Sequence, residues 1–481
     1  MYNQHTCPYC KESIEKHWLY CHNCGKPLIT NLDNFIDKSS SQSHEERTSL
    51  ASDIKLEEGY YDTNLIEDKE IEDKIQELDD ELRQREIQGD LSGDLLLKKA
   101  SLYYKLRDFS RAISNLELAL KNFLEANDLA NVAICHNEIG LIYEDSGYFE
   151  QSIYRFDRSL SILKDLNDQQ KVIQVLNNLG NVYYLIKDLE KSYDYYQKAL
   201  NLAEKENLEV EAVKSASNLV EILFKFKHYD RISKILKRNS EYFEKNQDLY
   251  GVIQTLIKYG KLYYFRGESN YDQSYQNFNH ALSLIRKVEN KISIYVKSKL
   301  EWECYLYLGK INLIWDNDIE AEDYLVKSLE AIRTFELKEH IKEGIVLEDL
   351  AELYLLKGED NKSVEYLNYA IEIYEKYGDK IKIAEIKRKL GNIYQKYMQN
   401  YLKARDYYEQ SLEIFESSDY LKEAAEILNI LGDLCVSSND SEAALNYFKQ
   451  SRRYYQDLED KYNSDIISEK IKSLEQYPNH N

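Results

Sequence analysis

Small and large apolar residues recur along this chain in one frame of about forty residues. In most copies a small residue is followed at +3 by Tyr or another large side chain, at +12 by Ala or Ser, at +16 by an aromatic residue or Leu, and at +19 by Ala or Ser. The frame predicts two amphipathic helices joined by a short loop at about +7 to +9. The small-residue positions of its nine copies are Ala100, Gly140, Gly180, Val220, Gly260, Gly309, Ala351, Gly391 and Gly432.

The spacing of these residues has a packing reason. A small residue midway along the first helix lets the second helix approach, and the Tyr one turn later lies on the same face and fills the space beside it. A single hairpin of this kind cannot bury its apolar faces alone, so successive copies are expected to stack into a superhelix. One interval, of 49 residues between Gly260 and Gly309, marks an irregular copy whose extra residues fall partly in 266–271.

Four of the seven cysteines form two close pairs near the N-terminus, Cys7 with Cys10 and Cys21 with Cys24. Two residues between cysteines let one tight turn aim both thiolates at a common point, and four thiolates are the soft, tetrahedral ligand set that zinc prefers. The segment also resembles the short zinc-ribbon family, with Tyr20 before the second pair. We therefore expect one structural zinc ion, with no open coordination position for catalysis.

The order of residues in the forty-residue frame resembles that of the tetratricopeptide repeat (TPR) over roughly residues 92–456, most closely from Asn177 to Leu200. The copies are longer than the usual repeat and lack the Pro that closes it, which is similar to the long repeats of kinesin light chain and the LGN or Pins group. The resemblance implies an all-α fold, a right-handed TPR superhelix or α-solenoid of helical hairpins. A small zinc ribbon and an acidic linker precede it.

The sequence therefore predicts four segments. They are a zinc ribbon at 1–30, an acidic flexible linker at 31–90, nine TPR-like hairpins at 91–460, and a C-terminal capping helix and tail at 461–481. Within the linker, Ile71, Ile75, Leu78 and Leu82 recur at helical spacing and predict a short amphipathic helix near 65–88. This helix is either a coiled-coil or docking element or a cover for the exposed edge of the repeats, and we favour the cover.

Composition and charge narrow the class of protein. With 3 Pro and 16 Gly in 481 residues, turn-rich sandwiches and barrels are disfavoured. Asp and Glu outnumber Lys and Arg by 85 to 63, which disfavours nucleic acid as a partner because the protein repels phosphate. No apolar run is long enough to predict a membrane span, and the cysteine pairs suit a reducing compartment. We therefore expect a cytoplasmic location.

An enzyme is the rival class, and its usual motifs are missing from the sequence. It has no Walker-type P-loop, no H-E-x-x-H, no G-x-S-x-G and no glycine-rich dinucleotide turn. Cys135, Cys304 and Cys435 fall at inward helix positions without a paired His, which indicates small core residues. We expect no enzymatic activity and no small-molecule substrate.

The resemblance to TPR proteins implies a protein-interaction scaffold or adaptor. In such proteins the first helices of successive hairpins line a concave surface that holds an extended peptide or a partner helix, and positions −3, +1 and +4 around the small residue face it. In this sequence those positions include Asn137, Asn177, Asn181, Tyr184, Glu221, Tyr264, Arg388, Asn392 and Asn429. A carboxamide can donate to a peptide C=O and accept from its N–H, so we favour peptide binding over a role in linking neighbouring helices.

The partner expected for this groove is an internal peptide segment, basic or apolar because the protein is acidic. The zinc ribbon would then be a second interaction module. An alternative is a regulatory sensor, in which the ribbon contacts nucleic acid and the repeats sense a peptide or protein signal. The ribbon carries only Lys11, Lys16 and Lys26 toward such a contact, so we rank this alternative below the scaffold.

Overall fold

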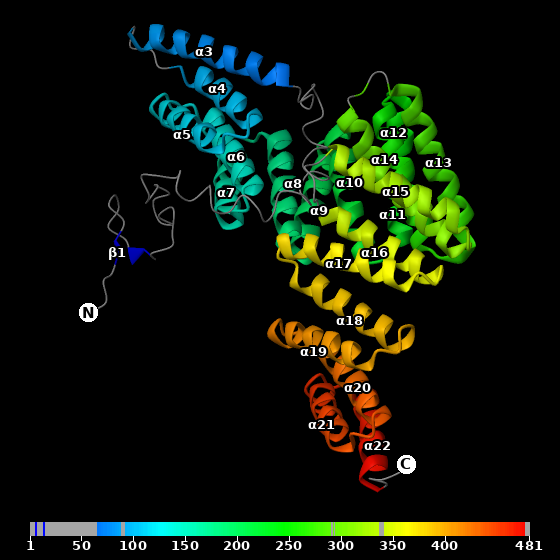
Figure 1. Cartoon of the computed structure of the whole chain (residues 1–481). Helices are drawn as coiled ribbons and strands as arrows, with labels where there is room; N and C mark the ends of the chain where they lie inside the picture. The colour runs from blue at the N-terminus through cyan, green and yellow to red at the C-terminus, as the bar shows by residue number, and fades with distance from the viewer. Residues whose placement is uncertain are drawn as a thin grey trace. The chain divides into compact units, whose positions relative to one another are not determined.

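The computed structural model describes residues 5–6, 13–14, 65–87, 92–289, 292, 294–335 and 341–476. They divide between two compact units, Met1–His228 and Tyr229–Asn481. The regular structure of the described residues is α-helical apart from two short strands and one 3-10 turn, which confirms the predicted all-α fold (Figure 1). None of the helices in the described ranges has both the length and the apolar character needed to cross a membrane.

The first unit begins with two short strands and continues with helices. Strands β1 (His5–Thr6) and β2 (Ser13–Ile14) pair antiparallel. The helices are α3 (Leu65–Ile87), α4 (Gly93–Lys105), α5 (Phe109–Glu125), α6 (Leu129–Asp145), α7 (Phe149–Asp165), α8 (Gln169–Leu185), α9 (Leu189–Lys205) and α10 (Glu209–Lys225). Each of α4 to α9 packs on the helix that follows it within the unit, as expected of stacked hairpins.

One turn geometry joins most of these helices. Lys187, two residues after α8 ends at Leu185, has a φ of 64°, and the next residue, Asp188, donates its backbone N–H to the carbonyl of Tyr183 at 2.9 Å. This hydrogen bond closes the last turn of α8. The Asp188 carboxylate then accepts from the backbone N–H of Lys191 at 3.1 Å and caps α9. The turn of residues 186–188 therefore both ends α8 and starts α9.

The same positive φ returns every twenty residues through the first unit. It is found at Arg107, Asn127, Gly147, Asn167, Lys187, Asn207 and Lys227. Since most of the helices between these turns span 17 residues, the forty-residue period is two identical helix-plus-turn steps. The regular turn keeps equivalent residues of successive hairpins in register.

The small residue of the frame makes room for the ring at +16. A Cβ added to Gly180 would lie 2.6 Å from the ring of Tyr196, and one added to Gly140 would lie 2.7 Å from the ring of Phe156. The Ser192 hydroxyl, at +12, also donates to the carbonyl of Gly180 at 2.8 Å. The +12 position is thus small because the helices are close, and Ser adds a hydrogen bond between them.

In several copies the Tyr at +3 stacks on an aromatic ring of the second helix of the hairpin. The rings of Tyr183 and Tyr195 lie 5.2 Å apart and are nearly parallel, and the same arrangement recurs for Tyr354 with Tyr366. A cation often adds to this stack, since the Lys191 ammonium lies 5.0 Å from the centre of the Tyr183 ring. These contacts account for part of the high Tyr content of the protein.

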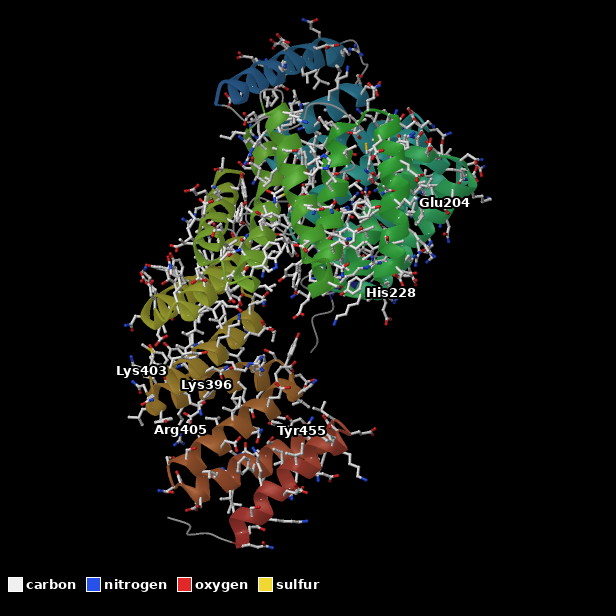
Figure 2. The ribbon with its side chains drawn as sticks, turned by 90° about the vertical axis from the view of Figure 1, so that its right-hand side faces the viewer. Glu204, His228, Lys396, Lys403, Arg405 and Tyr455 are labelled. Atoms are coloured by element: carbon white, nitrogen blue, oxygen red, sulfur yellow. The ribbon has the colours of Figure 1, made fainter. Side chains whose placement is uncertain are left out.

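The second unit contains the remaining helices. They are α11 (Tyr229–Lys245), α12 (Leu249–Phe265), α13 (Tyr271–Val288), α14 (Ile294–Ile314), α15 (Asp318–Phe335), α16 (Ile341–Leu356), α17 (Asp360–Lys376), α18 (Lys380–Lys396), α19 (Tyr401–Ser417), α20 (Leu421–Ser437), α21 (Ser441–Asp457) and α22 (Lys461–Gln476), with a 3-10 turn η1 (Glu268–Asn270). Figure 2 labels several side chains of this unit, among them Lys403, whose ammonium lies 5.0 Å from the Tyr394 ring.

The extra residues of the irregular fifth copy are spread over several elements. The 3-10 turn lengthens the first loop of the hairpin, as the sequence predicts for part of the insertion. More of the length goes into α14, which has 21 residues where the regular helices have 17. The boundary between the two units falls in the preceding copy, which has Val220 at its small position and Ile232 at +12.

The ends of the repeats carry an additional helix each. In the first unit Ile75 of α3 is buried against Ala100 and Tyr103. In the second unit Ile467 and Ile471 of α22 are buried in the last apolar cluster. Both helices cover apolar surface that a terminal hairpin would otherwise expose.

Because Gly180 touches the Tyr196 ring, we predict that any side chain at position 180 lowers the stability of the fold. We expect Gly180→Leu to lower the free energy of unfolding by about 1–3 kcal/mol because the core is overpacked. The measurement is urea denaturation followed by circular dichroism. In a Tyr196→Ala background the same substitution should cost clearly less, since the opposing ring is gone, and an equal cost in both backgrounds would contradict this explanation.

Candidate functional site

The first helices of the hairpins form the face on which the sequence places the binding residues. In the first unit α6 contacts α8 and α8 contacts α10, and in the second unit α12 contacts α14 and α14 contacts α16. Side chains at positions −3, −2 and +1 therefore meet across equivalent helices of successive hairpins. The two units use different chemistry for these cross-links.

In the first unit the hydrogen bonds between first helices join mostly uncharged side chains. Asn178 of α8 donates from Nδ2 to Oδ1 of Asn137 on α6 at 2.9 Å. Asn177 of α8 donates from Nδ2 to the hydroxyl of Ser215 on α10 at 2.9 Å. Asn137 and Asn177 thus link neighbouring helices, which is the role that the sequence favours less than peptide binding.

Asn181 is held by a tyrosine from the second helix of its own hairpin. The Tyr196 hydroxyl reaches past Gly180 and donates to Asn181 Oδ1 at 2.6 Å. Burial raises the pKa of Tyr196 well above its ordinary value, and the charges of Glu144 and Glu221 add to this effect, as does Tyr184. The phenol therefore stays protonated at neutral pH and can act as a donor.

Three amides of the first unit are buried with polar atoms that have no hydrogen-bond partner among the described residues. These atoms are Oδ1 of Asn177, Nδ2 of Asn181 and both side-chain polar atoms of Asn218 on α10. The three side chains are only 1–2% exposed. An unmet buried donor or acceptor costs roughly 1–3 kcal/mol. Because these atoms are buried, a polar group of a ligand would meet them only after the neighbouring side chains had moved. We call Asn177, Asn181 and Asn218 the amide cluster.

In the second unit the cross-links are ion pairs. Lys261 of α12 pairs with Glu303 of α14 at 2.8 Å, and Lys310 of α14 pairs with Asp349 of α16 at 2.7 Å. Further along, Arg388 of α18 pairs with Glu426 of α20 at 3.0 Å. Arg388 is therefore engaged with a neighbouring helix.

The remaining binding candidates of the second unit also have intramolecular contacts. Asn429 accepts from Lys470 of α22 at 2.8 Å, and Asn392 accepts from the Tyr408 hydroxyl at 2.8 Å. Tyr264 packs against the ring of Tyr307 at 5.0 Å, and burial raises its pKa to about 12. The nine candidates are thus divided between the two units.

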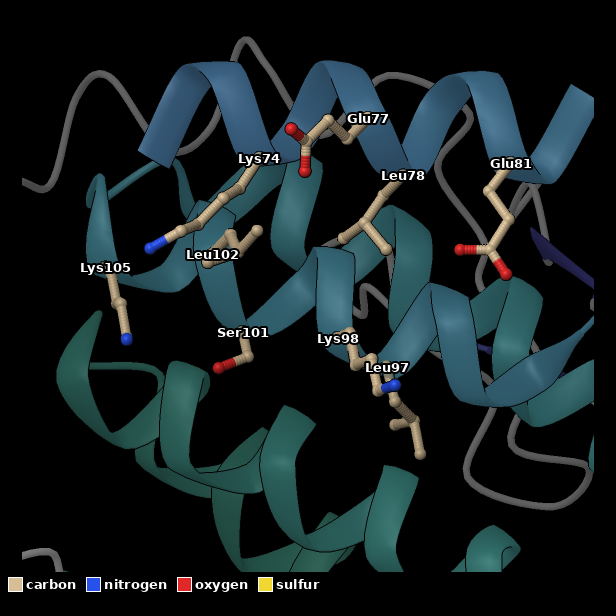
Figure 3. A pocket seen from close by; sticks show the side chains of 9 residues that line it. All are labelled: Lys74, Glu77, Leu78, Glu81, Leu97, Lys98, Ser101, Leu102 and Lys105. Atoms are coloured by element: carbon tan, nitrogen blue, oxygen red, sulfur yellow. The ribbon is translucent and has the colours of Figure 1, made fainter. Parts of the chain in front are cut away.

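A pocket of about 580 Å³ lies between α3 and α4 (Figure 3). Its lining residues are Lys74, Glu77, Leu78, Glu81, Leu97, Lys98, Ser101, Leu102 and Lys105. Both signs of charge surround an apolar floor, so the lining favours neither anions nor cations strongly. None of its side chains has a buried unpartnered polar atom among those found in the described residues, which distinguishes it from the amide cluster.

The predicted zinc ligands Cys7, Cys10, Cys21 and Cys24 lie outside the described residues. The other three cysteines are buried and have free thiols. Burial raises the pKa of Cys135 to about 12, so this thiol is protonated and unreactive at neutral pH.

Sequence reasoning missed Tyr196, Ser215 and Asn218 as members of this site. One signal could have found Tyr196, because the frame has Asn directly after the Gly in only two copies, at Asn181 and Asn392. These are also the two copies in which the ring that packs on the Gly is a Tyr. The pairing of Asn with Tyr predicts the hydrogen bond that the structure contains.

Family models of the tetratricopeptide repeat match residues 173–206 and 382–457. No curated protein matches this sequence. Among solved structures, it is similar to a signal transduction ATPase with numerous domains (STAND) protein with a tetratricopeptide repeat sensor from Pyrococcus horikoshii. The identity is 17% over 79% of this chain and 54% of that chain, with a TM-score of 0.52.

The protein is also similar to the apo form of the quorum sensor NprR from B. thuringiensis, at 13% identity over 80% of this chain and 99% of that chain, with a TM-score of 0.50. At such identities the likeness concerns the fold alone. The repeat models and the helical hairpins agree with the residue frame read from the sequence. The protein therefore contains tetratricopeptide repeats within an α-solenoid fold.

Proposed function

We propose that this protein is a non-enzymatic interaction scaffold that binds an extended peptide segment of a partner on the first-helix face of its first unit. The observation that carries the proposal is the amide cluster, which offers buried donors and acceptors with no partner among the described residues. Backbone amides of a peptide have the complementary groups. The descriptions of two proteins of similar fold as sensors support a role in recognition.

The amide cluster would need no charged ligand. Asn177, Asn181 and Asn218 are neutral, so they would bind backbone groups regardless of the side chains of the partner. Specificity for a basic or apolar segment would come from the surrounding side chains, among them Glu221. The long-repeat subclass similar to kinesin light chain stays a prediction.

Removal of two amides tests this proposal. We expect the double variant Asn177→Ala and Asn181→Ala to weaken binding of peptides selected by the wild-type protein by about tenfold or more, with a melting temperature lowered by a few degrees at most. The measurement is fluorescence anisotropy with a labelled peptide from a random display library. The matched control is Asn429→Ala in the second unit, because Lys470 keeps Asp433 as a partner at 2.7 Å. Equal binding by the double variant and the wild type would place the contact elsewhere.

We further propose that Cys7, Cys10, Cys21 and Cys24 hold one structural zinc ion and that this ribbon is a second interaction module. The paired strands β1 and β2 flank the first cysteine pair in the sequence and support this assignment. Because so short a segment cannot bury a core of its own, the metal would supply its folding energy.

Metal analysis tests the zinc proposal directly. We expect one zinc ion per protein molecule, lost in Cys21→Ser but kept in the control Cys435→Ala, because Cys435 lies in a helix of the second unit. Helical circular dichroism should be nearly the same in all three proteins, since the repeats carry their own apolar core. A wild-type protein without zinc, or loss of the helices in Cys21→Ser, would refute an independent structural ribbon.

A further inference from the structure

The second residue of the second helix is polar in most copies of the frame. In α7, α9, α11, α13 and α21 it is Asp or Glu, for example Glu150 and Glu442. An acidic side chain suits this place because the first turn of a helix has a partial positive charge. In α15 the residue is Ile319, which is 82% exposed. Ile319 therefore buries little apolar surface within the fold and stands where an acid would stabilise the helix better.

Other exposed apolar residues lie close to Ile319. Ile314 ends α14 and Trp315 follows it, and these two residues are 44% and 36% exposed. The Trp315 ring packs against the ring of Tyr275 on α13, with the ring centres 5.3 Å apart, so its position is fixed. Single exposed apolar residues are common on protein surfaces, but several that gather in one place mark an interaction site.

The next hairpin adds a fourth apolar residue. Leu356 ends α16 and is 61% exposed. The ammonium of the next residue, Lys357, donates to Glu322 of α15 at 2.8 Å, and the Tyr354 hydroxyl donates to the same carboxylate at 2.6 Å. These bonds hold the end of α16 against the first turns of α15. We call the following four residues the apolar edge: Ile314, Trp315, Ile319 and Leu356.

Carboxylates border the apolar edge. Asp316, Asp318 and Glu320 alternate with its residues in the sequence, and Asp316 and Glu320 are exposed. The lysine beside the edge, Lys357, is engaged with Glu322. The border is therefore acidic. An apolar centre with an acidic border is complementary to a segment that carries apolar side chains between basic ones.

The backbone around the edge favours a helical partner. The residues of the edge lie in α14, α15 and α16 or directly after them, where the backbone groups are bonded within helices, and no strand lies among residues 294–335 and 341–356. A strand of a partner would therefore find no ladder to extend. A helix bonds its own backbone and presents apolar side chains at i, i+3, i+4 and i+7.

We propose that the apolar edge docks a basic amphipathic helix of a partner protein, with the apolar stripe of that helix on Trp315 and Ile319 and its Lys or Arg side chains toward the carboxylates. A fixed aromatic ring beside an aliphatic side chain is an anchor that costs little ordering entropy on binding. The edge belongs to the second unit and contains no residue of the amide cluster, so this contact is independent of the peptide binding proposed above.

The variant Ile319→Glu tests this contact. It introduces the residue that other copies have, so we expect helical circular dichroism and the melting temperature to stay close to those of wild type. The probe is a labelled synthetic helix of Leu and Lys with Leu at i, i+3, i+4 and i+7, and its binding is measured by fluorescence anisotropy. We expect a loss of about tenfold or more in affinity, although the variant adds a charge that attracts lysine. A peptide held by charge alone would bind the variant at least as tightly as wild type.

Two controls separate the apolar contact from charge. Leu402→Glu adds the same charge at the equivalent position of α19, which is 84% exposed and is followed by Lys403. We expect this variant to bind the probe within about twofold of wild type. A second peptide with Ser in place of every Leu keeps the charge of the probe and should bind wild type at least about tenfold more weakly.

The outcomes decide the proposal. It is supported if Ile319→Glu loses the probe while Leu402→Glu and wild type bind it equally. It is overturned if wild type does not bind the Leu and Lys helix, if Ile319→Glu binds it as wild type does, or if the Ser peptide binds equally well. Sedimentation of wild type and Ile319→Glu without peptide gives one more check, because self-association that only the variant loses would assign the edge to a second copy instead.

Discussion

The close approach of two helices over a residue that lacks a Cβ is the contact on which the rest of the structure depends. Where Gly180 faces the Tyr196 ring, there is no room for even one more carbon atom. The distance between the helices then requires a small residue at +12, and Ser192 uses the closeness to bond with the Gly180 carbonyl. The spacing of small residues in the sequence thus reflects how near the helices come.

Regular turns convert this local contact into a repeating structure. A residue of positive φ follows most helices, and in several turns, such as that at Asp188, an adjacent polar residue caps the next helix. Most helices are therefore of equal length. Equivalent positions of successive hairpins therefore face one another, and side chains forty residues apart can bond. Asn178 with Asn137 and Lys310 with Asp349 are examples from the two units. Register, set by the turns, is what brings binding candidates together.

Cross-links between first helices engage the polar atoms that the proposed ligand binding would need. In the second unit most of these links are ion pairs, and Arg388 and Asn429 are engaged in them or beside them. In the first unit the links are mostly neutral, and within the described part of the chain buried polar atoms of Asn177, Asn181 and Asn218 have no hydrogen-bond partner; in the second unit the same holds for Oδ2 of Asp349. A neutral amide costs less to bury than an unpaired charge does, so the unit tolerates these side chains.

The sequence by itself determined the all-α fold, the repeating hairpin and the small-to-aromatic contact within each copy. These features follow from helical periodicity and from residues less than twenty apart, which the order of amino acids displays directly. The intramolecular contacts of the nine binding candidates needed the tertiary structure. The contacts of Asn137 and Asn181 depend on Asn178 and Tyr196, which lie on other helices. Those partners are brought together by the packing of one helix on another, which the order of residues within one copy does not display.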